Sequence, residues 1–203
     1  FEAGVPVALN DTPMPVTDII TALNEQGGLH GIGRIDHIED RVVGIKSREI
    51  YEAPAAIILI KAHQALETIT LTGSSLAFKR HIEEEYAKLI YEGGWFSHHH
   101  MDLVAYLQHN QKNVTGNIRL KLYKGNCIPT GRASEFSLYR KELATYTSES
   151  LYDQRAATGF IKIFGMENAV QAQAQLFNFV DETRVLTDPG EIVHKPQRRK
   201  GEG

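Results

Sequence analysis

Residues 54–69 read PAAIILIKAHQALETI. Pro54 suits the first turn of a helix, where its missing N–H would have no intrahelical partner. Apolar side chains then recur at helical spacing, at Ile58, Ala62, Leu66 and Ile69. Because the first half of this stretch is apolar on every side, we expect a largely buried helix.

The residues before this helix alternate between short structured segments and turns. Residues 30–51 interleave glycines and β-branched residues with charges, and we interpret them as two strands joined through Glu39 and Asp40. Farther upstream, Thr17 and Asp18 predict the cap of a short helix. The pair at residues 27–28 predicts its end, because glycine is the usual residue after a helix.

The residues after it predict two more helices and a hairpin. Residues 72–75 precede a helix that ends near residues 93–94, and a third helix runs from Ser97 to about Leu107. Residues 117–123 alternate apolar and polar side chains, which is typical of a half-buried strand, and a turn follows at residues 124–126. Pro129 indicates that the return strand lies at an edge or bulges.

These elements predict an α+β fold, with mixed helices and antiparallel strands in one compact domain. A helix-prone stretch rich in Gln and Ala at residues 169–177 extends it into a carboxy-terminal helical arm. The composition agrees with a globular domain, because 42% of the 203 residues are hydrophobic and 23% are charged. Cys127 is the only cysteine, so no intrachain disulfide can form, and we expect a small buried side chain there.

Composition also bears on location and partners. The longest apolar run, residues 55–60, is far too short to cross a bilayer, so we expect no membrane partner and a cytoplasmic location. The net charge of −3 gives no overall basic field for nucleic acid. Residues 195–203 are basic, and we interpret them as a solvated, disordered tail. Salt-sensitive binding of nucleic acid by this tail is the alternative.

Short motifs give little support to metal or nucleophilic chemistry. Residues 98–100 are all histidine, but adjacent helical residues point about 100 degrees apart and do not converge on one ion. The chain has no His-Glu-x-x-His, Cys-x-x-Cys or Gly-x-Ser-x-Gly pattern. Residues 72–75 suit a helix cap better than a phosphate-binding loop. We therefore predict no catalytic residue and no metal ligand.

Residues 30–52 are denser in polar side chains than the rest of the chain. A carboxylate accepts hydrogen bonds while a phenol both donates and accepts, so Glu39 beside Tyr51 could hold an ammonium or ureido group. The alternative is a charged hairpin with ordinary salt bridges. The residues alone leave both interpretations open.

Several motifs occur in the order that is found in the argininosuccinate synthases, and the chain resembles that family from residue 1 to about residue 177. These enzymes join citrulline to aspartate and convert ATP to AMP and pyrophosphate. The resemblance is carried by FEAGVPV at 1–7, HGIGRID at 30–36, GIKSR at 44–48, IYEAPA at 50–55, KG at 124–125, GR at 131–132, SLY at 137–139 and ATGFI at 157–161.

The resemblance implies a synthetase and multimerisation domain at residues 1–164 and an oligomerisation helix at 165–180, in a homotetramer. From the basic composition of the end of the chain, we expect a flexible basic tail at 181–203. It implies that Glu39 and Tyr51 contact citrulline. Aspartate and ATP with magnesium would be bound mainly by an amino-terminal nucleotide-binding domain, whose Ser-Gly-Gly-x-Asp loop has no counterpart here. Because the sequence opens on Phe1, we expect the natural chain to start upstream. A non-catalytic assembly or regulatory module is the alternative.

Two features depart from the family pattern. Residues 98–100 differ from those usual in relatives, and the tail from residue 178 is longer than the resemblance leads us to expect. These departures do not affect Glu39 and Tyr51.

Overall fold

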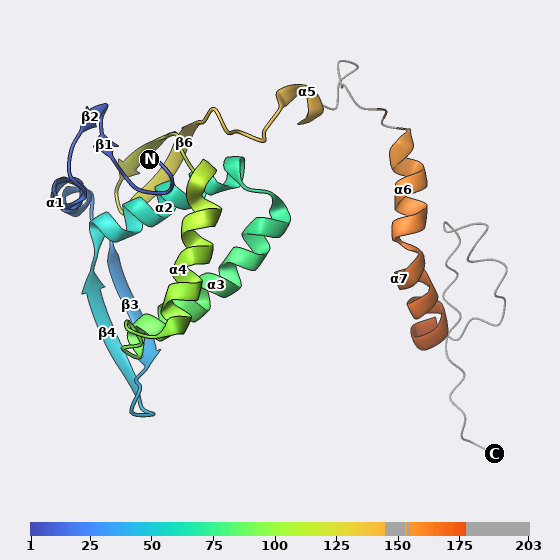
Figure 1. Ribbon diagram of the computed structural model, residues 1–203, viewed down its shortest axis with the longest axis horizontal. Coiled ribbons are helices and arrows are strands. Elements are labelled where there is room, and N and C mark those ends of the chain that lie inside the picture. The colour runs from blue at the N-terminus through green and yellow to red at the C-terminus, as the bar shows by residue number, and fades with distance from the viewer. Residues whose placement is uncertain (145–152, 154, 178–203) are drawn as a thin grey trace. The chain divides into compact units, whose positions relative to one another are not determined.

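The computed structural model describes residues 1–144, 153 and 155–177. The chain divides into two compact units, residues 1–140 and residues 141–203, and each is described by itself. Figure 1 labels the helices and strands of both.

The first unit combines helices with antiparallel strand pairs, which confirms the predicted α+β class. Each named strand pairs with its neighbour in chain order, so tight turns suffice to connect the partners. The elements are β1 (Ala8–Leu9), β2 (Thr12–Pro13), α1 (Val16–Leu29), β3 (Arg34–Asp40), β4 (Lys46–Glu52), α2 (Pro54–Thr70), α3 (Gly73–Tyr91), α4 (His98–Asn110), η1 (Gln111–Asn113), β5 (Asn117–Tyr123) and β6 (Asn126–Ala133).

Helix α2 forms the centre of the core. It packs against α1, α3, β5 and β6, and Leu66 on its inner face is completely buried. Burying one leucine side chain stabilises a fold by about 1.5–3 kcal/mol. The predicted burial of α2 is confirmed on this face, whereas Ile60 is 54% exposed, so the apolar first half is not covered all round. Cys127 of β6 is buried in the same core, as predicted.

Gly27 sets the distance between α1 and α2. A Cβ atom at this position would lie 2.6 Å from Pro54 Cβ and 2.9 Å from Ile58 Cδ1, so only glycine allows this close approach. The prediction that Gly27 and Gly28 end the helix was wrong, because α1 continues through both. The predicted cap is wrong as well, since α1 begins at Val16 without a side-chain cap.

Strands β3 and β4 form an antiparallel hairpin, called the ribbon below. Its register pairs Arg34 with Glu52 at the root and Asp40 with Lys46 near the tip. The predicted turn at Glu39 and Asp40 was wrong, because both residues belong to β3. The turn comprises residues 41–45 and is closed by a hydrogen bond from Arg41 N to Ile45 O of 2.8 Å.

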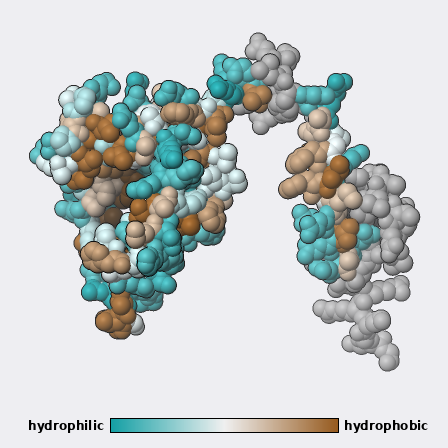
Figure 2. All heavy atoms as spheres, viewed as in Figure 1, coloured by the Kyte–Doolittle hydropathy of each residue, from teal (hydrophilic) through white to brown (hydrophobic). Residues whose placement is uncertain are grey.

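The tip of the ribbon is apolar and exposed. Val42 is 68% exposed and Val43 is 79% exposed. Figure 1 shows the hairpin of β3 and β4, and in Figure 2 a brown, hydrophobic group lies at its tip. Gly44 permits the turn because its φ of 84° lies in the left-handed region, which side chains with a Cβ disfavour.

Helices α3 and α4 lie side by side, and each begins at a hydroxyl cap (Figure 1). Thr72 Oγ1 accepts a hydrogen bond from Ser75 N at 3.3 Å, which confirms the helix-cap interpretation of residues 72–75. Ser97 Oγ accepts from His100 N at 3.1 Å in the same way. Such caps stabilise a helix by about 1 kcal/mol each.

A charged group lies inside the packed helices. Lys79 of α3 is 3% exposed, and its Nζ lies 2.9 Å from the Glu67 carboxylate of α2 and also contacts Glu83. Gln111 of η1 donates to Glu67 at 2.7 Å. Desolvation alone would lower the pKa of Lys79, but the two carboxylates together raise it above its usual value.

Strands β5 and β6 form the predicted hairpin, which packs against α2. The register shifts between Arg119 and Leu120, which face Gly131 and Pro129, so Thr130 is the extra residue of a β-bulge. This confirms the prediction that the strand carrying Pro129 lies at an edge or bulges. Lys124 and Gly125 form the turn, both at positive φ.

The second unit is helical where it is described. It contains α5 (Lys141–Ala144), α6 (Ala156–Phe164), α7 (Met166–Gln171) and η2 (Ala172–Phe177). Large apolar side chains of α6 and α7 are exposed, namely Phe160, Ile161, Ile163, Phe164, Met166 and Val170. The division at residues 164 and 165 stays a prediction, and the tail at 181–203 lies outside the described residues.

None of the helices in the described ranges combines the length and the apolar character that a membrane crossing requires.

Candidate functional site

The ribbon has two faces of different chemistry, because successive side chains of a strand point to opposite sides. On one face lie His37 and Glu39 of β3 with Ser47, Glu49 and Tyr51 of β4, and we call this the polar face. The opposite face carries cross-strand ion pairs, namely Arg34 with Glu52, Asp36 with Arg48, and Asp40 with Lys46. The two predicted site residues therefore share one face.

Glu39 and Tyr51 meet on the polar face. The Tyr51 hydroxyl donates to Glu39 Oε2 at 3.4 Å, which is a long hydrogen bond. Glu39 is placed opposite Ser47 and Tyr51 opposite Ile35, so the phenol reaches along the ribbon to the carboxylate. The structure thus brings together the residues that the sequence analysis paired.

The carboxylate of Glu39 retains unused acceptor capacity. Its other contacts are His37 Nε2 at 3.5 Å and Arg41 Nε at 3.8 Å, and its side chain is 23% exposed. By comparison, Asp36 on the opposite face accepts two shorter hydrogen bonds from Arg48, of 2.6 and 2.8 Å. A carboxylate can accept about four hydrogen bonds, so Glu39 can accept from an additional donor at a shorter distance.

The surroundings of Tyr51 raise the pKa of a phenol that is already neutral at physiological pH. Desolvation raises the pKa of Tyr51, and the negative charges of Glu39 and Glu49 raise it further. A neutral phenol is both a donor and an acceptor, whereas a phenolate only accepts. The polar face therefore offers an acceptor carboxylate next to a hydroxyl of dual character, an arrangement suited to an ammonium or amide group.

The remaining charges of the polar face balance one another. Arg41 Nη1 lies 3.2 Å from Glu49 Oε1, and Ser47 Oγ donates to the same oxygen at 2.9 Å. Glu49 is therefore more fully engaged than Glu39. The sequence analysis did not single out His37 or Glu49. With the correct turn, the alternation of strand residues would have placed both on the same face as Glu39 and Tyr51. The turn predicted at residues 39–40 prevented this.

The root of the ribbon is fixed against helix α2. A Cβ atom on Gly33 would lie 2.4 Å from Pro54 N, and the φ of Gly33 is 86°. Ala53 N donates to Gly33 O at 2.8 Å. Asn24 Oδ1 of α1 accepts from Ala55 N at 3.0 Å and so caps the start of α2. These contacts set the direction in which the ribbon leaves the core.

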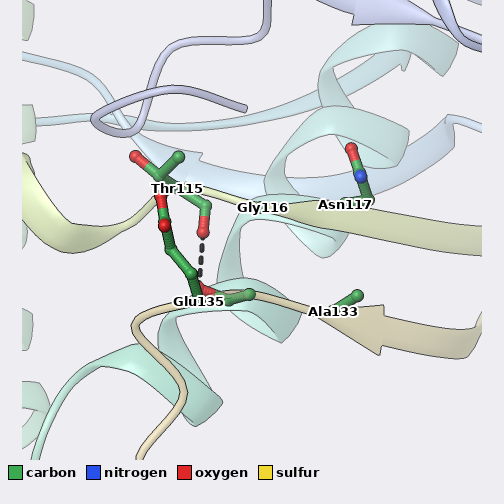
Figure 3. Close-up of a pocket in the computed structure, with 6 residues that line it drawn as sticks. Thr115, Gly116, Asn117, Ala133 and Glu135 are labelled. Carbon is green, nitrogen blue, oxygen red and sulfur yellow. Dashed lines mark hydrogen bonds between the residues drawn. The ribbon is translucent and has the colours of Figure 1, made fainter.

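A second candidate is an open hollow of about 380 Å³ at the end of the β5–β6 hairpin (Figure 3). Its hydroxyl groups are already engaged within the protein. Ser134 Oγ donates to Thr115 O at 2.6 Å and accepts from Phe136 N, while Thr115 Oγ1 accepts from Ala3 N. We therefore regard the polar face of the ribbon as the better candidate site.

The three consecutive histidines do not form a metal site. His99 pairs with Glu85 at 3.2 Å, whereas the ring of His100 stacks on Tyr86 with centroids 5.7 Å apart. Across the described ranges, no group of three or more His, Cys, Asp or Glu side chains is arranged to hold a metal ion.

The fold and the ribbon define an α+β domain that displays a polar two-stranded surface beside a buried helix. Residues 1–171 match the family described as the arginosuccinate synthase C-terminal domain. The match covers most of the chain, and the chain belongs to this family.

Similar curated proteins carry the same family name. Argininosuccinate synthases of Bacillus thuringiensis, Bacillus cereus and Bacillus anthracis are each 53% identical to this chain over 173 residues. The aligned region is 85% of this chain but 43% of each relative. The chain thus spans less than half of the length of these relatives.

Proposed function

We propose that this chain is the substrate-completing and subunit-assembling part of an ATP-dependent ligase that joins citrulline to aspartate. The observation that carries the proposal is the family match over residues 1–171, together with the 53% identity to argininosuccinate synthases. The 3.4 Å approach of Tyr51 to Glu39 supports the assignment of the substrate contacts.

In the proposed reaction, the ureido oxygen of citrulline attacks the α-phosphorus of ATP and pyrophosphate leaves. The amine of aspartate then attacks the ureido carbon, and AMP departs with the oxygen to give argininosuccinate. ATP with magnesium is bound mainly by a nucleotide-binding domain, which would correspond to the part of the longer relatives that this chain does not cover. Glu39 and Tyr51 act by holding citrulline in position, which can lower the barrier by several kcal/mol without any proton transfer by them.

Charge complementarity supports the role of Glu39. Its carboxylate is partly covered and loosely held, so it attracts the positive end of citrulline more strongly than a fully solvated group would. Tyr51, a neutral phenol whose pKa its surroundings raise, hydrogen-bonds beside it.

The test uses the longer protein that contains this chain. Pyrophosphate release from ATP is measured with and without citrulline and aspartate, and we expect release to require both amino acids. If ATP is consumed without either amino acid, or not at all, the ligase proposal fails. In the second case the non-catalytic assembly module becomes the better account.

Two variants test the site within the same assay. Glu39→Gln keeps the shape of the side chain but removes its charge, so the KM for citrulline should rise about 10-fold or more while the KM for ATP stays unchanged. Glu52→Gln on the opposite face, where the side chain is 74% exposed, is the matched control and should change neither. An unchanged citrulline response in Glu39→Gln contradicts the assigned role.

Assembly into a homotetramer in the cytoplasm is the second part of the proposal. Association of subunits is supported by the apolar side chains that α6 and α7 expose, such as Phe160 and Phe164, whose ring centroids are 5.2 Å apart. An exposed apolar surface of this kind is typical of an interface. Phe164→Ser should shift the sedimentation of the complete enzyme toward smaller species, whereas Lys162→Ser on the same helix should not.

A further inference from the structure

His37 completes a three-residue contact on the polar face of the ribbon. Its Nε2 lies 3.5 Å from Glu39 Oε2, the same oxygen that accepts from the Tyr51 hydroxyl at 3.4 Å. The His37 and Tyr51 rings are 5.5 Å apart and tilted by 54°. Each of the three side chains therefore contacts the other two.

The two donors define the orientation of the carboxylate. Because His37 and Tyr51 both approach Oε2, they favour one rotamer of Glu39. In this rotamer Oε1 lies near Arg41, whose Nε is 3.8 Å away. Without His37, the carboxylate would be held by a single long hydrogen bond and by Arg41. A carboxylate that is free to rotate loses more conformational entropy when a ligand fixes it, which weakens binding.

The surroundings of His37 are dominated by acidic groups. Its register partner on β4 is Glu49, its neighbour in β3 is Asp36, and Glu39 and Tyr51 are in contact with it. The side chain is 42% exposed, so it is neither a core residue nor fully solvated. Its position therefore matches a supporting contact at the edge of a binding surface.

We propose that His37 is a positioning residue of this site, which orients the Glu39 carboxylate toward the amino-acid substrate. This inference rests on the proposed function of Glu39 and Tyr51, and it adds a residue that the sequence analysis did not single out. His37 acts on the substrate through Glu39 and takes no part in bond making.

Two substitutions separate the two contacts that His37 makes. His37→Phe keeps a ring against Tyr51 but removes the donor to Glu39. His37→Gln keeps an N–H donor but removes the ring. His81→Phe, at an exposed histidine of α3, is the matched control for the loss of an imidazole.

The measurement is steady-state kinetics of the complete enzyme with each substrate varied in turn. His37→Phe should raise the KM for citrulline about 3-fold to 10-fold, the range expected for one weak hydrogen bond to a charged group. The kcat and the KM values for aspartate and ATP should stay unchanged. His37→Gln should recover most of the affinity, and His81→Phe should match the wild type.

A double variant provides the decisive comparison. If His37 acts through Glu39, then adding His37→Phe to Glu39→Gln should raise the citrulline KM no further. Additive effects would overturn the inference, as would an unchanged citrulline KM in His37→Phe or a uniform loss of kcat. If Glu39→Gln leaves the citrulline KM unchanged, the proposed role of the site fails. If only the histidine variants are silent, the inference about His37 fails by itself.

Discussion

Lys79 Nζ lies 2.9 Å from Glu67 Oε1, and the two side chains are 4% and 5% exposed. The pair connects α3 to α2, and Gln111 extends the contact to η1. A buried ion pair adds little net stability, but removing one partner leaves an uncompensated charge in the core. Lys79 and Glu67 are therefore sensitive positions for the packing of the helices.

Lys79→Met should lower the free energy of unfolding by about 3–5 kcal/mol, because Glu67 would remain buried without its cation. Combining it with Glu67→Gln should recover part of this loss, since the charge is removed as well. Lys88→Met, at an exposed position of the same helix, should change stability by less than about 1 kcal/mol. Denaturant unfolding of the protein measures all three. Equal effects at positions 79 and 88 would contradict this account.

Gly33→Ala should destabilise the protein more than Gly44→Ala. Both glycines have positive φ, 86° and 84°, so both variants carry a backbone cost of about 1–2 kcal/mol. Only at Gly33 would the added Cβ also collide with Pro54, because the space around Gly44 is open. The difference in unfolding free energy between the two variants measures the packing at the root of the ribbon. No difference would mean that the root is not tightly packed.

The adjacent residues Gly27 and Gly28 should respond to alanine with opposite signs. Gly27→Ala should destabilise by about 1–3 kcal/mol, because its Cβ would overlap Pro54 and Ile58. Gly28→Ala meets no atom within 4 Å and lies in the same helix, so it should stabilise by up to about 1 kcal/mol. Thermal unfolding of the protein compares the two variants. Stabilisation by both substitutions would exclude the close helix contact.

Asp36 should titrate below its ordinary pKa of 3.8 because Arg48 donates to its carboxylate. A carboxyl group whose pKa is lowered on folding contributes stability above its unfolded pKa, and that stability is lost as the pH falls through the folded pKa. Carboxyl carbon NMR during an acid titration should show the Asp36 pKa rising toward 3.8 in Arg48→Gln. An unchanged titration would show that the ion pair does not form in solution.

Local sequence signals were sufficient for α2 and for one hairpin. The spacing of apolar residues predicted α2, and the alternation in residues 117–123 predicted β5, because both periods follow directly from backbone geometry. The turn of the ribbon was misplaced because residues 41–45 include Val42 and Val43. These β-branched residues favour strands, yet here they lie at an exposed turn.

Contacts between distant segments could not be predicted in this way. Lys79 lies in α3 a few residues before a run of glutamates, and its burial depends on Glu67 and Gln111 from other elements. Gly27 was interpreted as a helix stop because glycine is the usual residue after a helix. Its contact with Pro54, which is distant in sequence, could not be predicted from the local pattern. The roles of Lys79 and Gly27 depend on how separate elements pack together, and the sequence pattern of a single helix does not show this.

The candidate site was predictable in part. Family resemblance led to Glu39 and Tyr51, but neither composition nor spacing could place the phenol 3.4 Å from the carboxylate. That distance depends on the register of the ribbon and on its turn. Once the register is known, His37 follows from the alternation of side chains, since it lies on the same face as Glu39.

The two-faced ribbon also makes the length of its strands a functional constraint. Deleting one residue from β3 between Arg34 and Glu39 would move every later side chain of that strand to the other side. The carboxylate at Glu39 would then join the ion-paired surface, and Tyr51 would face a different neighbour. A deletion of two residues would preserve the sides and only displace the contact along the hairpin. Tolerance of this segment to insertions and deletions should therefore alternate between odd and even numbers of residues.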